Sequence, residues 1–337
     1  MTVPVNTEQM HDITPHPGCW RRFLVRWMPP QRQRAVPWGA LEVVFVFLAV
    51  NLWPVMMTDV LNDWGFFQWL YGSELLAEQE GGTEKVLNLR LHIWASLVAF
   101  PGMVATIVMV PWLISGTRPY QLGLTGHRFL RNLDIGIIGF FILTPLAYGV
   151  LMLCILFYGV DEPHPFTQVM QQQVIPGEWW ALVLVAMVVA PVWEEMFFRG
   201  LLQRWLTRHQ WGGAAAVAAS LLLVYQLGKP PLAWQEGRLT ILWLNAAPLL
   251  FVLALLPMYG CIHRYARTPI PGAIFGSALL FAVGHSAWPQ PVALFVLGLG
   301  LGWMAQRTQS LVGPIVVHSL FNGVACVMLL VSPPPAG

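Results

Sequence analysis

The chain has 337 residues, of which 56% are hydrophobic and 10% are charged, and its formal net charge at pH 7 is +2. An ordinary soluble domain carries about 25% charged residues, so this composition excludes a soluble fold. The small net charge also argues against a nucleic-acid-binding protein, and we expect no nucleic-acid partner. The hydrophobic residues are grouped into long runs, as membrane-spanning helices require.

Nine of these runs are candidate membrane spans, since about 20 mostly apolar residues cross ~30 Å of hydrocarbon. They lie near 38–60, 91–115, 135–160, 179–199, 212–227, 239–259, 271–287, 291–306 and 312–331. The fifth and eighth runs are the shortest. The sequence therefore predicts an all-α, polytopic transmembrane helical bundle of eight or nine spans.

The loop charges predict how the bundle is oriented, because Arg and Lys are enriched in cytoplasmic loops. Residues 1–37 are polar and rich in arginine, with no cleavable signal sequence, so we expect a cytoplasmic N-terminal tail. The acidic segments 61–90 and 161–178 would lie outside, and the basic connections at 116–134 and 260–270 inside. Nine alternating spans then place the C-terminal tail, 332–337, outside. We expect an integral protein of the cytoplasmic (inner) membrane.

Two pairs of glycines four positions apart predict close packing between helices. They are Gly272 with Gly276 and Gly298 with Gly302. Such a spacing leaves a strip of helix without side chains, which a neighbouring helix can approach closely. The pattern is common in membrane helices, so it predicts packing and no chemistry.

A charged cluster interrupts the fourth predicted span. It contains Glu194, Glu195 and Arg199, and one charged side chain within a span costs about 2.5–3.5 kcal/mol on insertion scales. Glu195 and Arg199 are four positions apart on a helix and can pair. Glu194 is turned about 100° from that pair and lacks a local counter-ion, so it could act as a general base. Alternatively, the cluster could lie in water at the cytoplasmic end of the helix.

Two histidines and an asparagine lie in later predicted spans. His285 is in the seventh, and His318 and Asn322 are four positions apart in the last, on one helix face. Each motif alone is compatible with hydrogen bonds between helices. Together with Glu194 they form a polar constellation that offers a base, a partner to orient water and donors for an oxyanion.

These motifs resemble those of the CAAX protease and bacteriocin-processing (CPBP) family, which includes the type II CAAX prenyl proteases. The family pattern is Glu-Glu-x-x-x-Arg, then Phe-x-x-x-His, then His-x-x-x-Asn, each on a membrane helix. The matching residues are Glu194, Glu195 and Arg199, then Phe281 and His285, then His318 and Asn322. The resemblance covers about 179–331.

The resemblance implies an intramembrane endopeptidase. It implies four catalytic residues, Glu194, His285, His318 and Asn322, and three supporting residues, Glu195, Arg199 and Phe281. Glu194 would be the general base and would activate water together with His285. His318 and Asn322 would stabilise the oxyanion that forms on the substrate carbonyl.

We expect no cofactor, although a zinc site is a rival mechanism. Its ligands would be His285, His318 and Glu194, since two histidines, one carboxylate and a water form an accepted catalytic zinc set. The sequence has no His-Glu-x-x-His pattern, and asparagine is a poor zinc ligand. These two points favour glutamate-dependent hydrolysis.

The spacing of the motifs departs from the family pattern in one place. Arg199 and His285 are 86 positions apart, and two predicted spans lie between them. We therefore expect a catalytic membrane core at 179–331 with a two-span insertion near 212–259, preceded by N-terminal spans and loops at 38–178. An even number of inserted spans preserves the direction of the later helices, so the site can still assemble.

Two non-enzymatic classes remain as alternatives. In a membrane scaffold, the same polar residues would form a bonding network or a partner-binding groove. A transporter ranks last, because the sequence shows no inverted repeat and no paired broken helices. The complete set of three motifs favours the peptidase, whose partners would be the lipid bilayer and a membrane-associated peptide or protein. The resemblance implies prenylated C-terminal peptides or leader and bacteriocin-related peptides as substrate classes.

Overall fold

The computed structural model describes residues 36–77, 84–158, 177–227, 232–235, 238–241, 243–285 and 288–331. Most of the predicted N-terminal tail, the middle of segment 61–90, nearly all of the acidic segment 161–178 and the C-terminal tail lie outside these residues. The first part of the described chain forms α2 (Ala40–Asp63), α3 (Phe66–Ala77), α4 (Glu84–Ser115), the short 3-10 helix η2 (Pro119–Leu122) and α5 (Phe129–Tyr158).

The fourth predicted span is one continuous stack of five helical segments. These are α7 (Glu178–Leu184), η3 (Val185–Val189), α8 (Ala190–Glu195), η4 (Met196–Leu202) and α9 (Gln203–Leu206). The segments η3 and η4 are π-helical. The rest of the chain forms α10 (Gly212–Leu227), β1 (Leu232–Gln235), β2 (Arg238–Ile241), α11 (Trp243–Tyr265), α12 (Ile270–Val283), α13 (Gln290–Thr308) and α14 (Val312–Val331).

Every predicted span coincides with a helix, so the helical membrane bundle is confirmed. Six helical stretches in the described part of the chain are long and apolar enough to cross a membrane. They are Ala40–Asp63, Leu87–Ser115, Phe129–Phe157, Glu178–Leu206, Ala246–Tyr265 and Val312–Val331. The helices α10 and α12 are apolar but shorter, and α13 is outside this set, so the count of eight or nine spans is approximate.

Two predicted boundaries were wrong. Residues 239–241 do not open the sixth span but belong to β2, which pairs antiparallel with β1; Thr240 and Ile241 are β-branched and favour an extended backbone. The helix α12 ends at Val283, so His285 lies just past it rather than inside a span. Gly284 is a weak helix former, which explains the early end.

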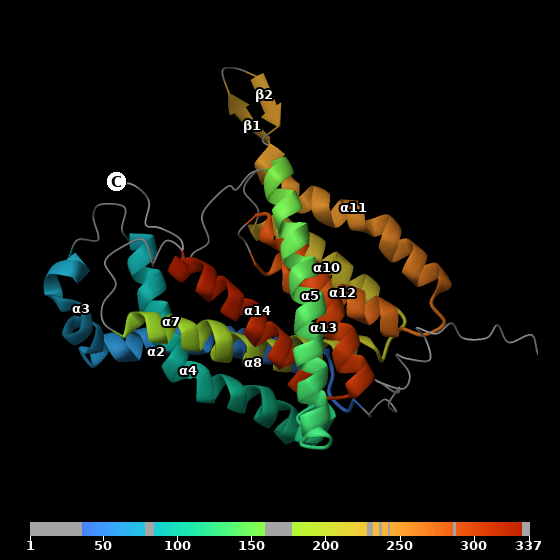
Figure 1. Cartoon of the computed structure of the whole chain (residues 1–337), viewed down its shortest axis with the longest axis horizontal. Coiled ribbons are helices and arrows are strands. Elements are labelled where there is room, and N and C mark those ends of the chain that lie inside the picture. The colour runs from blue at the N-terminus through green and yellow to red at the C-terminus, as the bar shows by residue number, and fades with distance from the viewer. Residues whose placement is uncertain are drawn as a thin grey trace, which may run out of the picture.

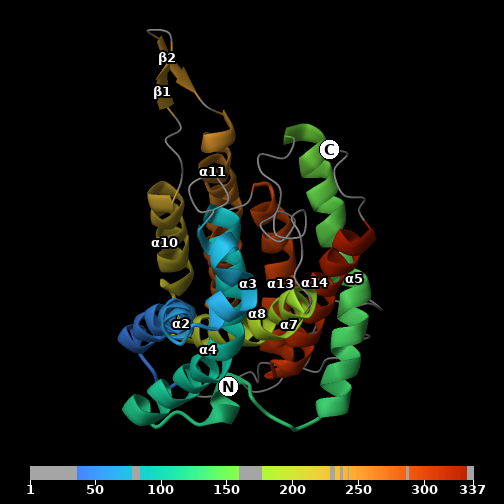
Figure 2. The ribbon, with the colours of Figure 1, turned by 90° about the vertical axis from the view of Figure 1, so that its left-hand side faces the viewer.

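The stack from α7 to α9 is the central helix of the bundle. In its most apolar stretch 61% of the residues are buried, against 11–33% in the other five long spans. Figure 1 shows α7 and α8 running between α2 and α4 on one side and α14 on the other, with α5, α12 and α13 nearby. In Figure 2 the hairpin extends from one end of the molecule, beyond α10 and α11. This central position buries the cluster at Glu194.

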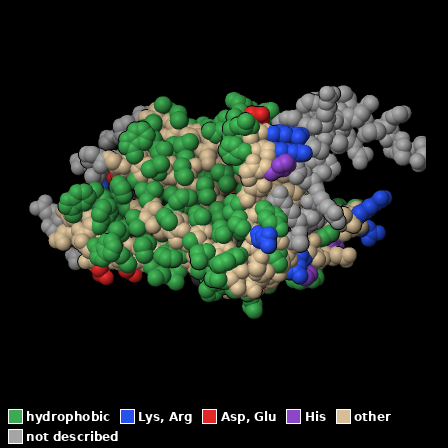
Figure 3. Space-filling model, turned by 90° about the horizontal axis from the view of Figure 1, so that it is seen from below, with side chains coloured by type: hydrophobic (Ala, Val, Ile, Leu, Met, Phe, Trp, Pro, Cys, Tyr) green, Lys and Arg blue, Asp and Glu red, His purple; other side chains and the backbone are tan. Residues whose placement is uncertain are grey.

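The outer surface is apolar where a bilayer would contact it. On the face seen in Figure 3, hydrophobic side chains cover the middle, and Lys, Arg and His side chains gather toward one end. Large apolar side chains such as Leu41, Leu156 and Phe157 are about four-fifths exposed. Such exposure suits hydrocarbon and not water, which supports an integral membrane protein.

Polar contacts fix the start of the central helix. Glu178 begins α7 and is buried, and its Oε1 accepts a hydrogen bond from the Tyr71 hydroxyl at 3.1 Å. Arg90 Nε lies 3.5 Å from the same oxygen, and Trp94 Nε1 donates to the Tyr71 hydroxyl. Burial raises the pKa of Tyr71, so its hydroxyl stays protonated and donates. These contacts join α3 and α4 to α7.

The predicted glycine pairs do mediate close approach. A Cβ at Gly276 would lie 2.5 Å from the Cβ of Ala216 in α10, and one at Gly302 would lie 2.6 Å from Oε1 of Gln203 in α9. A side chain at Gly276 would therefore push α10 away, and one at Gly302 would displace the Gln203 side chain. The first pair therefore seats α12 on α10, and the second seats α13 on the central helix.

Candidate active site

Glu195 is the centre of a buried charge network. Its Oε1 accepts a hydrogen bond from Arg199 Nη1 at 2.9 Å and lies 2.9 Å from His318 Nδ1, which donates to it. The three residues are at most 3% exposed. A buried charge is tolerated only when it is paired and hydrogen-bonded. The structure therefore contains the Glu195–Arg199 pair predicted from the sequence and adds His318 to it.

Glu194 is in a different state from its neighbour. Its side chain is 11% exposed, whereas that of Glu195 is fully buried. Glu194 Oε2 lies 3.8 Å from His318 Nε2 and has no hydrogen-bond partner among the described residues. The His318 ring thus lies between two carboxylates, and of these two side chains only that of Glu194 is partly exposed.

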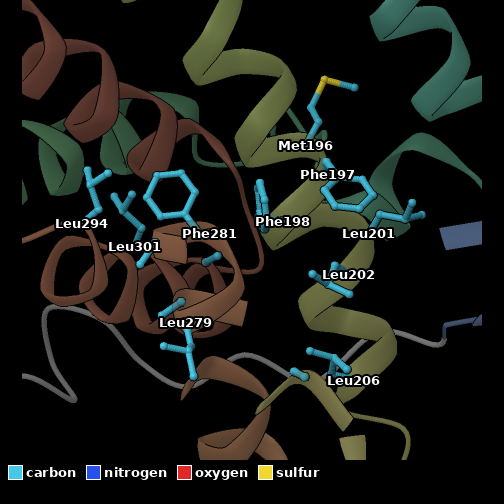
Figure 4. Close-up of a cluster of buried hydrophobic side chains, with 14 of the residues drawn as sticks. Met196, Phe197, Phe198, Leu201, Leu202, Leu206, Leu279, Phe281, Leu294 and Leu301 are labelled. Carbon is cyan, nitrogen blue, oxygen red and sulfur yellow. The ribbon is translucent and has the colours of Figure 1, made fainter. Parts of the chain in front are cut away.

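Phe281 connects the three motifs through its ring. The guanidinium carbon of Arg199 lies 4.3 Å from the ring centroid, close enough for a cation–π interaction. The rings of His285 and His318 lie 5.1 Å and 5.5 Å away, both edge-on. The ring of Phe198 packs edge-on at 5.3 Å, as Figure 4 shows among the buried side chains. Phe281 therefore brings α12 to the charge network.

His285 has one ring nitrogen committed to the backbone. Its Nδ1 lies 2.9 Å from the carbonyl oxygen of Phe281, and a carbonyl only accepts, so Nδ1 carries the proton. In the neutral ring, Nε2 is then the nitrogen that can accept a proton or orient water. The hydrogen bond of His285 thus goes to the backbone of Phe281, and its ring packs edge-on against the Phe281 ring, which also contacts Arg199.

Asn322 forms a hydrogen bond to the central helix at η3, which precedes the glutamates in the chain. Its Nδ2 donates to the carbonyl oxygen of Ala186 in η3 at 2.7 Å. An amide nitrogen has two hydrogens, so this bond leaves the second for another acceptor. The bond also fixes the position of Asn322, one turn along α14 from His318.

The two π-helical segments bracket the glutamates. In a π turn the backbone bonds run from i to i+5, which widens the helix, and such turns are frequent at functional sites. In both segments a carbonyl also accepts a side-chain bond from another helix: Ala186 from Asn322, and Phe198 from Ser277 Oγ at 3.1 Å. The widened turns therefore tie α14 and α12 to the central helix.

Arg199 and Gln203 also bond to the backbone of α13. Arg199 Nη2 donates to the carbonyl oxygen of Gly298 at 3.5 Å, and Gln203 Nε2 to that of Gly302 at 2.9 Å. The sequence analysis missed Gln203 and Ser277. Each lies four positions from a motif residue and so shares its helix face, which is the signal that could have found them.

The arrangement does not fit a zinc site as it stands. Within the described residues, no three His, Cys, Asp or Glu side chains lie close enough together to hold a metal ion. The set of His285, His318 and Glu194 would have to move to bind zinc.

Comparison with known protein families finds a match in the second half of the chain. The family model of the type II CAAX prenyl endopeptidases, Rce1-like, matches residues 176–261 and 249–324. The predicted resemblance is confirmed. All seven motif residues lie within the matched stretches, and the match indicates an intramembrane peptidase. No curated protein and no solved structure matches the chain significantly.

The family match also runs through 212–259, the segment predicted to be a two-span insertion. The helices α10 and α11 occupy most of this segment, and the two matched stretches overlap at 249–261. The division of the chain into an N-terminal part, a core and an insertion stays a prediction.

The bond from Ser277 to the π segment can be tested by removing its hydroxyl. We expect Ser277→Ala to lower the free energy of unfolding by about 0.6 kcal/mol, with an upper bound of about 1.7 kcal/mol, typical of bonds between membrane helices. Ser220→Ala is the matched control, because Ser220 is equally buried but bonds to Ala216 of its own helix. Unfolding of both variants in one detergent would measure this, and equal losses would show that Ser277 does not connect helices.

Proposed function

We propose that the protein is a glutamate-dependent intramembrane endopeptidase that cleaves a peptide bond of a membrane-associated protein or peptide. The observation that carries this proposal is the state of Glu194, whose side chain is 11% exposed and whose Oε2 has no hydrogen bond, beside the fully buried pair of Glu195 and Arg199. The family match supports the same reaction class.

The first step is the activation of water. The Glu194 carboxylate takes a proton from a water molecule, whose second contact is Nε2 of His285. The oxygen of that water forms a bond to the carbonyl carbon of the scissile peptide, and the electron pair of the C=O bond moves to the carbonyl oxygen. A base held in a site from which most water is excluded acts more strongly on bound water than the same base in solution.

The second step needs donors for the oxyanion. The free Nδ2–H of Asn322 is one, and Nε2 of His318 is the other. Because Nδ1–H of His318 donates to Glu195, a hydrogen on Nε2 requires the imidazolium form. The cluster then holds two carboxylates and two cations, with Arg199 as the second, and is neutral overall. Donors fixed in advance stabilise a developing charge without reorganisation.

The last step breaks the peptide bond. The proton held by Glu194 passes to the leaving nitrogen, the C–N bond breaks, and the oxyanion collapses to a carboxylic acid. The products are a new C-terminus and a new amine, and Glu194 returns to its starting state. Prenylated C-terminal peptides are the substrate class that the description of the family suggests, with leader and bacteriocin-related peptides as the alternative.

We expect two different results when each of the adjacent glutamates is changed to glutamine, a loss of turnover for one and a loss of stability for the other. Glu194→Gln removes the proposed base, so we expect turnover to fall by 10²–10⁴-fold or more while the protein stays folded. Glu195→Gln leaves Arg199 and His318 without their shared partner, so we expect a loss of about 3–5 kcal/mol of stability. Thermal unfolding and the peptide termini in membranes from matched cells would measure both effects.

The scaffold alternative makes a different prediction for the Glu194→Gln variant. If the cluster only binds helices together, Glu194→Gln leaves the peptide termini unchanged and the variant supports whatever the wild type supports. Termini that depend on Glu194 would establish the peptidase and would identify its substrate.

A metal-independent reaction predicts that chelators leave activity unchanged. Within the described residues, no three potential zinc ligands lie close enough together to hold a metal ion, so we expect no zinc at the site. Elemental analysis of purified protein, with activity measured before and after dialysis against a chelator, would test this. One tightly bound zinc per chain whose removal abolishes activity would reverse the assignment.

We further propose that the protein lies in the cytoplasmic membrane with its N-terminus inside and its C-terminus outside. The charges at this end of the bundle support this orientation, since Arg264 is in the last turn of α11 and Arg267 lies between α11 and α12. An epitope fused before residue 1 should be protected from protease in intact cells and degraded after permeabilisation. Degradation in intact cells would refute the orientation.

A further inference from the structure

A groove between α12 and α13 lies outside the proposed catalytic cluster. Its volume is about 490 Å³, within the roughly 300–1,000 Å³ of ordinary small-molecule sites. It is lined by Ile270, Pro271, Ile274, Leu299, Trp303, Gln306 and Arg307. Five of these side chains are apolar, and the only two polar ones are adjacent in sequence. The groove is therefore amphipathic.

The polar part of the groove lies at one end of the bundle. Leu299 and Arg307 are about 12 Å apart along α13, from the rise of ~1.5 Å per residue, and α13 ends one residue after Arg307. The Arg307 guanidinium carbon lies 5.9 Å from the centroid of the Trp303 ring. A cation stacked on an amphipathic aromatic ring at a helix end is typical of the headgroup level of a membrane.

We propose that this groove binds one anionic phospholipid, with an acyl chain along Ile274 and Leu299 and the phosphate at Arg307 and Gln306. A guanidinium donates paired, charge-assisted hydrogen bonds to a phosphate, and the Gln306 amide adds a neutral donor. The bilayer is as apolar as the groove, so chain contacts alone give no preference for any lipid. The contact between phosphate and Arg307 therefore decides which lipid is bound.

The groove lies beside the contact between α12 and α13 that supports the charge network. A Cβ at Gly302 would lie 3.2 Å from Cγ2 of Ile274, so α12 and α13 touch at the floor of the groove. Gly302 also accepts the hydrogen bond from Gln203. A lipid that binds here stabilises this packing in the folded protein. The inference does not depend on peptidase activity, because its readout is lipid binding.

The experiment is native mass spectrometry of the full-length protein, titrated with phosphatidylglycerol or phosphatidylcholine of identical chains. We expect the first phosphatidylglycerol to bind about fivefold more tightly, the effect of one basic residue near an anionic headgroup. Arg307→Gln should abolish that preference. Leu299→Trp should weaken the binding of both lipids by filling the groove, and it keeps the proposal testable if the first variant does not fold.

Arg264→Gln is the matched control. Arg264 is exposed and its guanidinium carbon lies 6.0 Å from the Tyr265 ring centroid, but it does not line the groove. It should leave the preference unchanged. If Arg264→Gln reduced the preference for phosphatidylglycerol as much as Arg307→Gln, the preference would come from the overall surface charge, and the proposal would be overturned. Equal binding of the two lipids to the wild type would also overturn it. Displacement of phosphatidylglycerol by farnesol, an uncharged isoprenoid, but not by phosphatidylcholine would assign the groove to an isoprenoid chain instead.

Discussion

The hydrogen bonds that Glu195 Oε1 accepts from Arg199 and His318 are the interaction on which the rest of the core depends. A charge in the interior of a membrane protein must be neutralised where it stands, because no water can move in to solvate it. Since the partners come from the central helix and from α14, a shift of either helix by one residue would leave an unpaired buried charge. The relative register of these two helices is therefore fixed, and with it the distance between Glu194 and His318.

The same constraint extends to α12 and α13 through Arg199. One face of its guanidinium is covered by the Phe281 ring, and Nη2 reaches the carbonyl of Gly298. A glycine is needed there because the helices approach closely: a Cβ at Gly298 would lie 3.1 Å from the Ala278 side chain. One ion pair thus sets the positions of four helical elements, and the π turns at η3 and η4 provide the backbone carbonyls that hold α14 and α12 in place.

The long apolar runs of the sequence predicted most of the helices, because a helix that crosses a membrane must be apolar and about 20 residues long. The Glu195–Arg199 pair and the two glycine strips were also predictable, since a spacing of four fixes which side chains share a face. The end of α12 before His285, the hairpin and the π turns depend on local backbone energies that differ by about 1 kcal/mol, and sequence patterns do not resolve such differences. Ser277 could have been found from its spacing of four to Phe281, but its partner Phe198 and the sharing of Glu195 by His318 join distant segments, so spacing along the chain does not reveal which residues meet. The partial exposure of Glu194 beside the fully buried Glu195 also depends on how the helices pack, and the adjacent positions of the two glutamates do not reveal it.

The helices α10 and α11 complete the support of the site. Gly213 of α10 approaches the backbone of Gly272 so closely that a Cβ at Gly213 would lie 2.6 Å from the Gly272 carbonyl oxygen, and Ala216 meets Gly276 one turn further. This contact lies on the opposite end of α12 from Phe281, so α10 holds the helix that carries the ring against the central stack. The helix α10 thus braces α12. A bilayer exerts no hydrophobic force between helices, so a short helix such as α12 needs this kind of close backbone packing to keep Phe281 and His285 at the level of Arg199.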